Sequence, residues 1–326
     1  MGHKLNFIGD VRSDFLGKSN LTLSKGDVLF FTEEKSLKHF YSEQEDYYFL
    51  PKEMDLDILD DKYKFNIAID AIGERTIYSR LVTECNENNI LFPILLKPRF
   101  SWKGSIKMPK AEVVSNYSDL TLKLSNLSLG VIPDDFLLQK LINITPTDNK
   151  SISGYYSYKT EFSHLIATER LLSADLADKT TAAAVRTVKD EWGLFARTQN
   201  ILKKIKFEGV FELEFLFDCE SNEFYVLELN PRFWMQHGIF INHFDNCLIK
   251  YYLGLDQNEG YQQIFSTKKV LWVDTICLFK KERVVHLIKL ICSHFYFGYS
   301  IQLSPNIFFF FKYLLKLKLR RHKVCD

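Results

Sequence analysis

The sequence is short of the features that would assign it to several common classes of protein. Its six cysteines are scattered along 326 residues and form no C-x-x-C pair, which argues against a zinc ribbon or a disulfide framework. No Gly-rich dinucleotide fingerprint is present. The net charge is only +1, so overall charge gives no reason to expect a nucleic acid partner. We therefore expect a cytoplasmic setting, in which the cysteines stay reduced.

Signals for export and for membrane insertion are also scarce. The first ten residues, MGHKLNFIGD, lack the apolar core of a signal peptide. The longest stretch without Lys, Arg, Asp or Glu, residues 290–311, is interrupted by His294, Gly298 and a Ser-Pro-Asn run. We therefore predict no membrane-spanning helix.

The length and the 46% content of hydrophobic residues are enough for a sizeable core in two or three lobes. Strand-like runs at residues 27–32 and 47–50 predict a short N-terminal α/β lobe over residues 1–60. The main domain is expected over residues 61–260, and an amphipathic, basic C-terminal extension over residues 261–326.

The most informative stretch runs from residue 207 to residue 238. Apolar and acidic residues alternate from Phe211 to Asp218, and only Leu216 breaks the polar side. A turn-prone patch at residues 218–222 joins this run to a second alternating run, residues 223–229. The two runs predict a β-hairpin with one buried face.

Two strands of this hairpin would direct Glu214, Glu228 and Asn230 toward one small volume. Mg²⁺ takes oxygen ligands and is commonly held by one or two carboxylates together with substrate phosphates. The three residues therefore predict a magnesium-nucleotide site, and Arg232 would reach a phosphoryl oxygen from the same face. A solvated acidic face is the alternative, although ordinary wet faces tend to mix Lys with Glu.

Two lysines upstream are candidates for binding an anion. Asp61 is a good N-cap for a helix over residues 63–72 that ends at Gly73, and Lys62 lies at its start. The apolar run ILFPILLKP predicts a buried strand that ends with Lys97. Burying that charge alone would be costly, so Lys97 needs an anionic partner. The alternatives are a surface lysine at position 62 and a salt-bridged lysine at position 97.

Glu214 followed by Glu228-Leu-Asn230-Pro-Arg232 resembles the metal-binding signature of the ATP-grasp superfamily. Asp61-Lys62, Lys97-Pro98 and the run FLLQKLI at residues 136–142 precede it in the family's order, so the resemblance covers about residues 61–243. It implies an α+β, ATP-grasp fold in which two α+β subdomains clasp a nucleotide. A short α/β lobe would precede this domain, and a helical, basic C-terminal extension would follow it.

The resemblance also implies roles for individual residues. Mg²⁺ (or Mn²⁺) would lie on Glu214, Glu228 and Asn230, and ATP phosphates on Lys62 and Lys97. Lys97 and Arg232 would act in catalysis, with Arg232 stabilising the transferring phosphoryl group. Relatives carry several glycines in the loop after Lys97, whereas this chain has one, so side-chain donors would replace them: Arg99, Ser101, Lys103 and Ser105. Adenine would be bound by Gln139 and by the backbone of Lys140, Leu141 and Ile142.

The activity that the resemblance implies is ATP-dependent carboxylate–amine ligation through an acyl phosphate. The sequence most resembles stand-alone ligases that join amino acids to cell-wall or surface-polysaccharide precursors. Two alternatives stay open. One is an ATP-grasp enzyme of another reaction type, such as carboxylation. The other is a non-catalytic nucleotide-binding or scaffold protein at a membrane surface.

Three further segments carry expectations. Residues 151–172 alternate like paired strands from which Arg170 projects, and residues 177–205 are predicted to be mostly helical. Residues 308–321 place aromatic residues beside cations, which is typical of a helix lying on an anionic membrane or against a partner. A helix packed on its own protein with a basic outer face is equally compatible with this pattern.

Overall fold

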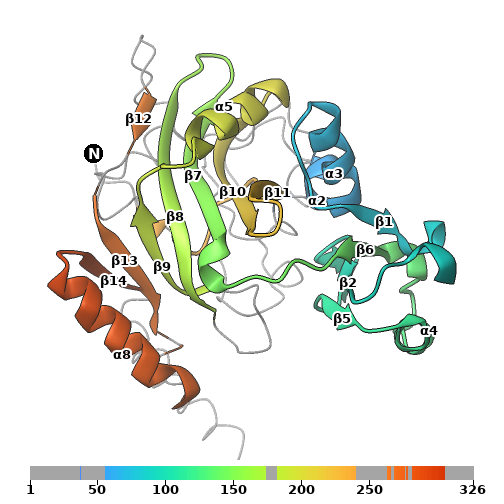
Figure 1. Cartoon of the computed structure of the whole chain (residues 1–326). Helices are drawn as coiled ribbons and strands as arrows, with labels where there is room; N and C mark the ends of the chain where they lie inside the picture. The colour runs from blue at the N-terminus through green and yellow to red at the C-terminus, as the bar shows by residue number, and fades with distance from the viewer. Residues whose placement is uncertain are drawn as a thin grey trace, which may run out of the picture.

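The fold is seen in a computed structural model that describes Leu37 and residues 56–173, 182–239, 263–265, 268–275, 277 and 281–304. Most of the predicted N-terminal lobe and the basic tail lie outside these residues. The described part contains a four-stranded sheet, an eight-stranded sheet and a two-stranded hairpin (Figure 1). Its mixed helices and sheets confirm the predicted α+β class.

The four-stranded sheet forms the small lobe and is antiparallel, in the order β1-β6-β2-β5. Leu96, Val114 and Leu120 belong to the buried core on the side that α4 covers. The hairpin β3-β4 follows β2. The bounds are β1 (Ser79–Leu81), β2 (Ile94–Pro98), β3 (Trp102–Lys103), β4 (Ile106–Lys107), β5 (Glu112–Val114), α4 (Tyr117–Ser125) and β6 (Phe136–Lys140).

Two helices precede this lobe, α2 (Leu56–Asp60) and α3 (Lys62–Ala71). The Asp61 carboxylate caps α3 by accepting the backbone N–H of Tyr63 at 3.0 Å. Gly73 follows the helix with a φ of +82°, a left-handed conformation that favours glycine. The predicted N-cap and stop signal are therefore confirmed.

The eight-stranded sheet is the large lobe, with strands in the order β11-β10-β7-β8-β9-β13-β14 and with β12 parallel to β8. The predicted hairpin is confirmed as β10 and β11, and the predicted strand pair as β7 and β8. The bounds are β7 (Asn149–Ser157), β8 (Ser163–Ser173), β9 (Ala182–Val188), β10 (Glu208–Asp218), β11 (Glu223–Asn230), β12 (Gln263–Phe265), β13 (Val270–Asp274) and β14 (Ser300–Ser304).

The two faces of this sheet have different surroundings. One face packs against α5 (Leu194–Lys204), α2 and α3, where Phe211, Leu213 and Phe215 lie in the largest buried core. The opposite face carries Glu212 and Glu214, because side chains alternate along β10. Near β13 this second face turns apolar around Phe233, Trp234 and Trp272.

The prediction of a mostly helical segment at residues 177–205 is wrong for its first half. Residues 182–188 form β9, which lies between β8 and β13, and only residues 194–204 form a helix. The run AAAVRTV has no polar stripe because both faces of an inner strand are covered, and a buried helix gives the same apolar signal.

The C-terminal part of the described chain belongs to the large lobe. β13 and β14 pair in parallel, and α8 (Lys281–Tyr296) crosses between them and packs on the sheet through Leu287 and Leu290. Three strands beyond residue 261, β12, β13 and β14, thus belong to the sheet of the large lobe. Among the described helices, none combines the length and apolar character needed to span a bilayer.

Candidate functional site

The β10-β11 hairpin places acidic side chains directly across from one another. Glu214 pairs with Glu228, and Glu212 pairs with Asn230, in antiparallel register. The register shifts just after Glu214, where β11 carries one extra residue as a β-bulge. Up to that point paired residues share a face, so the predicted Glu214, Glu228 and Asn230 are brought together as expected from the alternation. We call Glu212, Glu214 and Glu228 the carboxylate cluster.

The carboxylate cluster crowds negative charge into a largely buried place. Burial and the charge of Glu228 raise the pKa of Glu214, and the two side chains share a hydrogen bond. Burial and the charge of Glu214 raise the pKa of Glu212 to about 8. Burial would raise the pKa of Glu228 as well, but the positive charges of Lys62 and Lys97 help to hold it below its usual value. A bound cation would favour the charged forms of these carboxyl groups.

Polar side chains from neighbouring strands fix Glu214 in place. Its Oε2 accepts hydrogen bonds from Asn149 Nδ2 at 3.0 Å and from Arg170 Nη2 at 3.4 Å. Asn230 Nδ2 lies 3.4 Å from Glu212 Oε2 and 3.5 Å from Glu214 Oε1. Arg170 thus projects onto the face of the carboxylate cluster.

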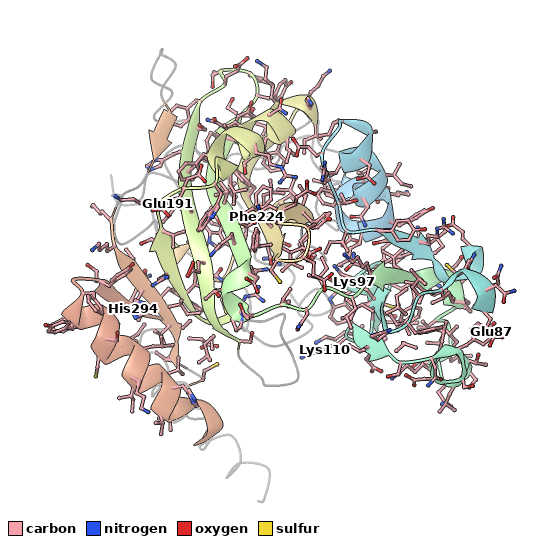
Figure 2. All side chains as sticks on the ribbon, viewed as in Figure 1. Glu87, Lys97, Lys110, Glu191, Phe224 and His294 are labelled. Carbon is pink, nitrogen blue, oxygen red and sulfur yellow. The ribbon has the colours of Figure 1, made fainter. Side chains whose placement is uncertain are left out.

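The two predicted lysines approach the cluster from different elements, Lys62 from the start of α3 and Lys97 from β2 of the small lobe. Lys97 lies on β2, on the side of the small lobe nearest the hairpin (Figure 2). Burial, helped by the charge of Lys62, lowers the pKa of Lys97 to about 8, although the charges of Glu228 and Glu214 oppose the shift. Lys62, at the first turn of α3, is thus close enough to act electrostatically on both Lys97 and Glu228.

Two predicted phosphate donors are engaged elsewhere. Arg99 forms an ion pair with Asp61 at 2.5 Å, and Lys103 forms one with Asp135 at 2.7 Å. The loop folds as the β3-β4 hairpin around Gly104, whose φ is +57°. Ser101 and Ser105 are exposed. The expectation that Arg99 and Lys103 present free cations to phosphate is therefore corrected, because each already has a carboxylate partner.

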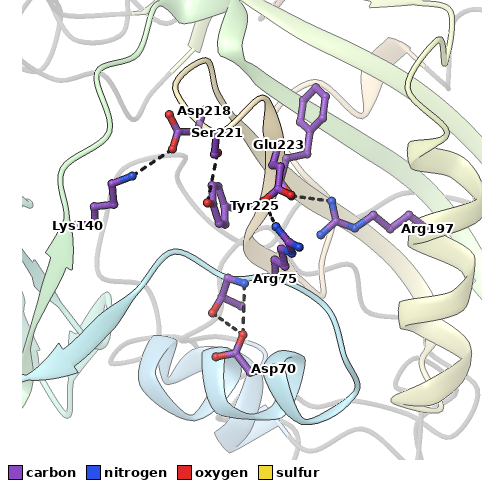
Figure 3. A network of polar contacts seen from close by, with 10 residues as sticks. Asp70, Arg75, Lys140, Arg197, Asp218, Ser221, Glu223 and Tyr225 are labelled. Atoms are coloured by element: carbon purple, nitrogen blue, oxygen red, sulfur yellow. Dashed lines mark hydrogen bonds and ion pairs between the residues drawn. The ribbon is translucent and has the colours of Figure 1, made fainter.

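The predicted adenine-binding segment lies where the two lobes meet. Gln139 is buried and donates from Nε2 to Ser79 Oγ at 3.0 Å. The Lys140 N–H donates to the Tyr78 carbonyl at 2.9 Å, and its side chain forms an ion pair with Asp218 at 3.2 Å (Figure 3). The Gln139 Nε2 and the Lys140 N–H are thus paired within the protein, so the contact predicted between Gln139 and adenine would use its amide oxygen.

Sequence reasoning missed an apolar group beside this segment. Ile142 packs with Ile77 and Leu216, and Leu227 lies against them. The signal was available, since Leu216 is the one apolar residue on the polar side of β10. Glu212 was visible in the same alternation, whereas nothing in the sequence around Asn149 indicated its contact with Glu214.

The side chains of Glu214, Glu228 and Asn230 suit a hard cation whose remaining ligands come from a bound substrate. In the described ranges, no group of three or more His, Cys, Asp or Glu side chains is arranged to hold a metal by itself. Two carboxylates and an amide oxygen, completed by phosphate oxygens, match the way Mg²⁺ is usually bound. Glu214 and Glu228 lie close enough to share a hydrogen bond, and their negative charges repel each other when both are ionised. A divalent cation bound between them would relieve this repulsion, which supports the fit.

Solved structures share this architecture. No protein-family model matches the sequence. Rhizobium etli pyruvate carboxylase has a TM-score of 0.55 at 13% identity, over 70% of this chain and 21% of that one. N5-carboxyaminoimidazole synthetase from Staphylococcus aureus, complexed with ADP, gives 0.56 at 17% identity, over 75% and 64%. The biotin carboxylase domain of Hydrogenobacter thermophilus 2-oxoglutarate carboxylase, with MgADP, gives 0.56 at 13% identity, over 73% and 55%.

These neighbours are ATP-grasp enzymes, and the chain has the ATP-grasp fold. The resemblance drawn from Glu214 and residues 228–232 is thus confirmed at the level of the fold. The chain spans less than two thirds of the length of each of these three proteins.

Proposed function

We propose that this chain is an ATP-dependent ligase that joins a carboxylate to an amine. The observation that carries the proposal is the carboxylate cluster on the large lobe, opposed by Lys62 at the start of α3 and by Lys97 on the small lobe. Acidic groups for a metal and ammonium groups for phosphates are the two requirements of phosphoryl transfer from ATP. The ATP-grasp fold supports the assignment of ATP and Mg²⁺.

The nucleotide would bind with its phosphates between these two sets of charges. Glu214, Glu228 and Asn230 would hold Mg²⁺, which neutralises charge on the phosphates. Lys62 and Lys97 would lie on the phosphates themselves. Because the Gln139 Nε2 and the Lys140 N–H are already paired, adenine would be bound by the Gln139 amide oxygen and by the backbone of Leu141 and Ile142. Leu216 and Ile142 would supply its apolar surroundings.

The reaction proceeds by two displacements. A carboxylate oxygen of the substrate attacks the γ-phosphorus, and the bond to ADP breaks, which gives an acyl phosphate. The amine nitrogen then attacks the acyl carbon, phosphate leaves, and the nitrogen loses a proton to form the amide. Arg232, directly after the hairpin, would stabilise the transferring phosphoryl group together with Lys97. Positioning and charge neutralisation suffice, so no nucleophilic side chain is needed.

The acid or the amine is proposed to belong to a cell-wall or surface-polysaccharide precursor. The support is the sequence resemblance to stand-alone ligases of that kind. The structural neighbours include carboxylases, so bicarbonate is the competing carboxylate. Consumption of ATP with bicarbonate but with no amino or uronic acid would favour that second reaction.

The test is a screen of amino acids and uronic acids for release of phosphate from ATP. The Glu228→Gln variant serves as the blank, and Glu220→Gln, at an exposed glutamate in the turn of the same hairpin, is the matched control. We expect release that requires both a carboxylate and an amine, is lost in Glu228→Gln and is kept in Glu220→Gln. Tight ATP binding without consumption under any condition would instead support a non-catalytic nucleotide-binding protein.

We also propose that the C-terminal part of the chain contacts an anionic membrane, where such precursors are attached. Along α8, Val285, Ile288 and Phe295 follow one another at helical spacing and are 55%, 52% and 73% exposed. Tyr296 and Phe297 continue this apolar surface. A surface of this size and composition is unusual on a protein that contacts only water.

Charge supports a lipid surface as the occupant. Residues 280–326 contain ten basic residues against only Glu282 and Asp326, the basic ones being Lys280, Lys281, Arg283, Lys289, Lys312, Lys316, Lys318, Arg320, Arg321 and Lys323. Apolar side chains flanked by cations are the composition that binds anionic bilayers.

Sedimentation of the full chain with phosphatidylcholine vesicles, with and without phosphatidylglycerol, tests this contact. We expect binding to the anionic vesicles that is lost in Ile288→Glu/Phe295→Glu. Leu129→Glu, which adds a negative charge at a 99% exposed position on the small lobe, should bind like the wild type. Equal vesicle binding by all three proteins would refute the proposed membrane contact of α8. The contact would also be refuted if Ile288→Glu/Phe295→Glu dissociated a dimer of the chain and left vesicle binding unchanged.

A further inference from the structure

The backbone of Arg99 joins the end of β2 to the start of α3. Its carbonyl accepts the N–H of Lys62 at 3.1 Å, and its own N–H donates to the carbonyl of Asp135 at 2.9 Å. Lys62 opens α3, and Lys97 lies two residues before Arg99. Both predicted phosphate-binding lysines are therefore next to one connection.

The side chain of Arg99 makes this connection rigid. Its Nε and Nη2 donate to the two carboxylate oxygens of Asp61 at 3.1 and 2.5 Å, and Nη1 donates to the Asp134 carbonyl at 2.9 Å. A two-pronged contact of this kind fixes both distance and orientation. Asp61 is only 2% exposed and also caps α3. Any shift of the helix start relative to β2 would break several of these bonds together.

The connection acts against a repulsion. The charge of Lys62 disfavours the charged form of Lys97, so the two ammonium groups repel each other while both are protonated. The Asp61–Arg99 contact thus joins two segments whose lysines repel each other. The Asp61–Arg99 pair is neutral overall, so it can hold the two segments together without cancelling the charge that the lysines present.

We propose that Arg99 is a positioning residue that, through Asp61 and the Lys62 amide, keeps Lys62 and Lys97 at the spacing required to bind one polyphosphate. The inference rests on the proposed function, since it assigns these lysines to the phosphates of ATP. Arg99 itself contacts no phosphate, because its guanidinium is used within the protein. The phosphate ligands remain the two lysines.

A neighbouring ion pair provides a matched control. Lys103 pairs with Asp135 at 2.7 Å in the same loop, and none of its contacts described here reaches α3. Lys103→Gln therefore removes an ion pair of similar length and leaves the connection between β2 and α3 intact. Asp61→Asn complements it, because asparagine still caps the helix but no longer offers a charged, two-oxygen partner.

The experiment measures Mg-ATP binding by calorimetry and steady-state KM and kcat for ATP. Five full-length variants are compared with the wild type: Arg99→Gln, Arg99→Lys, Asp61→Asn, Asp61→Asn/Arg99→Gln and Lys103→Gln. We expect Arg99→Gln to weaken binding and to raise KM by about tenfold or more, because misplaced groups of this kind are costly, while kcat falls less. Arg99→Lys should recover little of the loss, because lysine cannot make the two-pronged contact.

The double variant should bind ATP no more weakly than Arg99→Gln, because both changes break the same connection. Lys103→Gln should bind like the wild type. Circular dichroism and the melting temperature show whether each variant is folded, and if Arg99→Gln fails to fold, Asp61→Asn carries the same comparison. Wild-type binding by a folded Arg99→Gln or Asp61→Asn overturns the inference.

The failure of the proposed function gives a different result. A wild-type protein that binds no ATP would remove the ligase and the positioning role together. A second measurement needs no turnover: acylation of Lys62 and Lys97 by an N-hydroxysuccinimide ester, followed by mass spectrometry. Mg-ATP should protect both lysines in the wild type and in Lys103→Gln, but not in Arg99→Gln. Protection retained in Arg99→Gln counts against the inference.

Discussion

Two groups of charged side chains lie on opposite faces of the eight-stranded sheet, on different strands, and they are built differently. On the face under α5, Lys150 lies 2.6 Å and Arg186 lies 2.7 Å from the two oxygens of Glu169, and Lys150 stacks on Trp192. We call these three charged residues the salt-bridge cluster. On the other face, the carboxylate cluster gathers three acidic groups whose charges repel.

This difference in pairing distinguishes charges that stabilise the fold from charges that are available to a ligand. The salt-bridge cluster supplies its own counter-ions, so it needs nothing from outside the protein. In the carboxylate cluster two of the three pKa values are raised, and the cations nearby come partly from another lobe. Charges left in this state within a folded protein are typical of a site that a ligand completes.

The largest expected effect is on turnover. Glu228→Gln removes a proposed metal ligand, and we expect ATP turnover to fall on the order of a thousandfold, about 4 kcal/mol of transition-state stabilisation. Glu169→Gln, the same change on the opposite face, should lower turnover far less in protein that remains folded. Phosphate-release assays on both variants compare the two clusters, and similar losses would break the comparison.

The next effect concerns stability without ligands. Glu169→Gln leaves the buried Lys150 and the partly exposed Arg186 without their anion and should cost about 3 kcal/mol of unfolding free energy. Glu212→Gln replaces a carboxyl that already tends to stay protonated, so its change should remain within about 1 kcal/mol. Urea unfolding at pH 7 measures both, with Glu161→Gln as an exposed ion-pair control. A larger loss in Glu212→Gln would contradict the assignment.

Ligand-induced stabilisation sharpens the same contrast. Mg-ATP at about 100 times its Kd should raise the unfolding free energy of the wild type by about 2.7 kcal/mol. The same increment is expected for Glu169→Gln, whose site is intact, and not for Glu228→Gln. EDTA should abolish it. Thermal shift measurements with ATP alone, with Mg²⁺ alone and with both provide the controls.

The smallest expected effect comes from a buried group outside both clusters. Burial lowers the pKa of His164 to about 4 from its usual 6.5, so the unfolded chain binds more protons than the folded protein between these values. Stability from this residue is therefore lost as pH falls below 6.5, by about 2 kcal/mol at pH 5. Urea unfolding should show that the unfolding free energy of the wild type falls more steeply below pH 6.5 than that of His164→Gln. If the unfolding free energies of the two proteins changed with pH in the same way, His164 would not be the cause.

Much of the site could be predicted because its pattern is local. Glu214, Glu228 and Asn230 alternate with apolar residues on two strands joined by a short turn, so register follows from the chain itself. The helix at residues 62–71 has its cap and its stop within the segment. Where local pattern and tertiary contacts agree, the prediction is confirmed.

The errors occur where long-range contacts decide. Residues 182–188 form an inner strand because β8 and β13 flank them, and β13 lies more than eighty residues further on. Arg99 resembles a free phosphate donor until Asp61, 38 residues earlier in the chain, is seen to pair with it. The sequence around a charged loop residue does not show whether that residue is already paired with a residue far away in the chain.

The contacts between the lobes determine which way the small lobe can turn. Asp218 and Glu223, at the tip of the β10-β11 hairpin, form ion pairs with Lys140 and Arg75 (Figure 3), and Arg197 of α5 pairs with Glu74 beside them. A lobe held along one edge rotates about that edge as about a hinge. If the lobes open for the nucleotide that the proposed function requires, the β3-β4 hairpin, which none of these ion pairs holds, would move further than Lys140, which one of them holds.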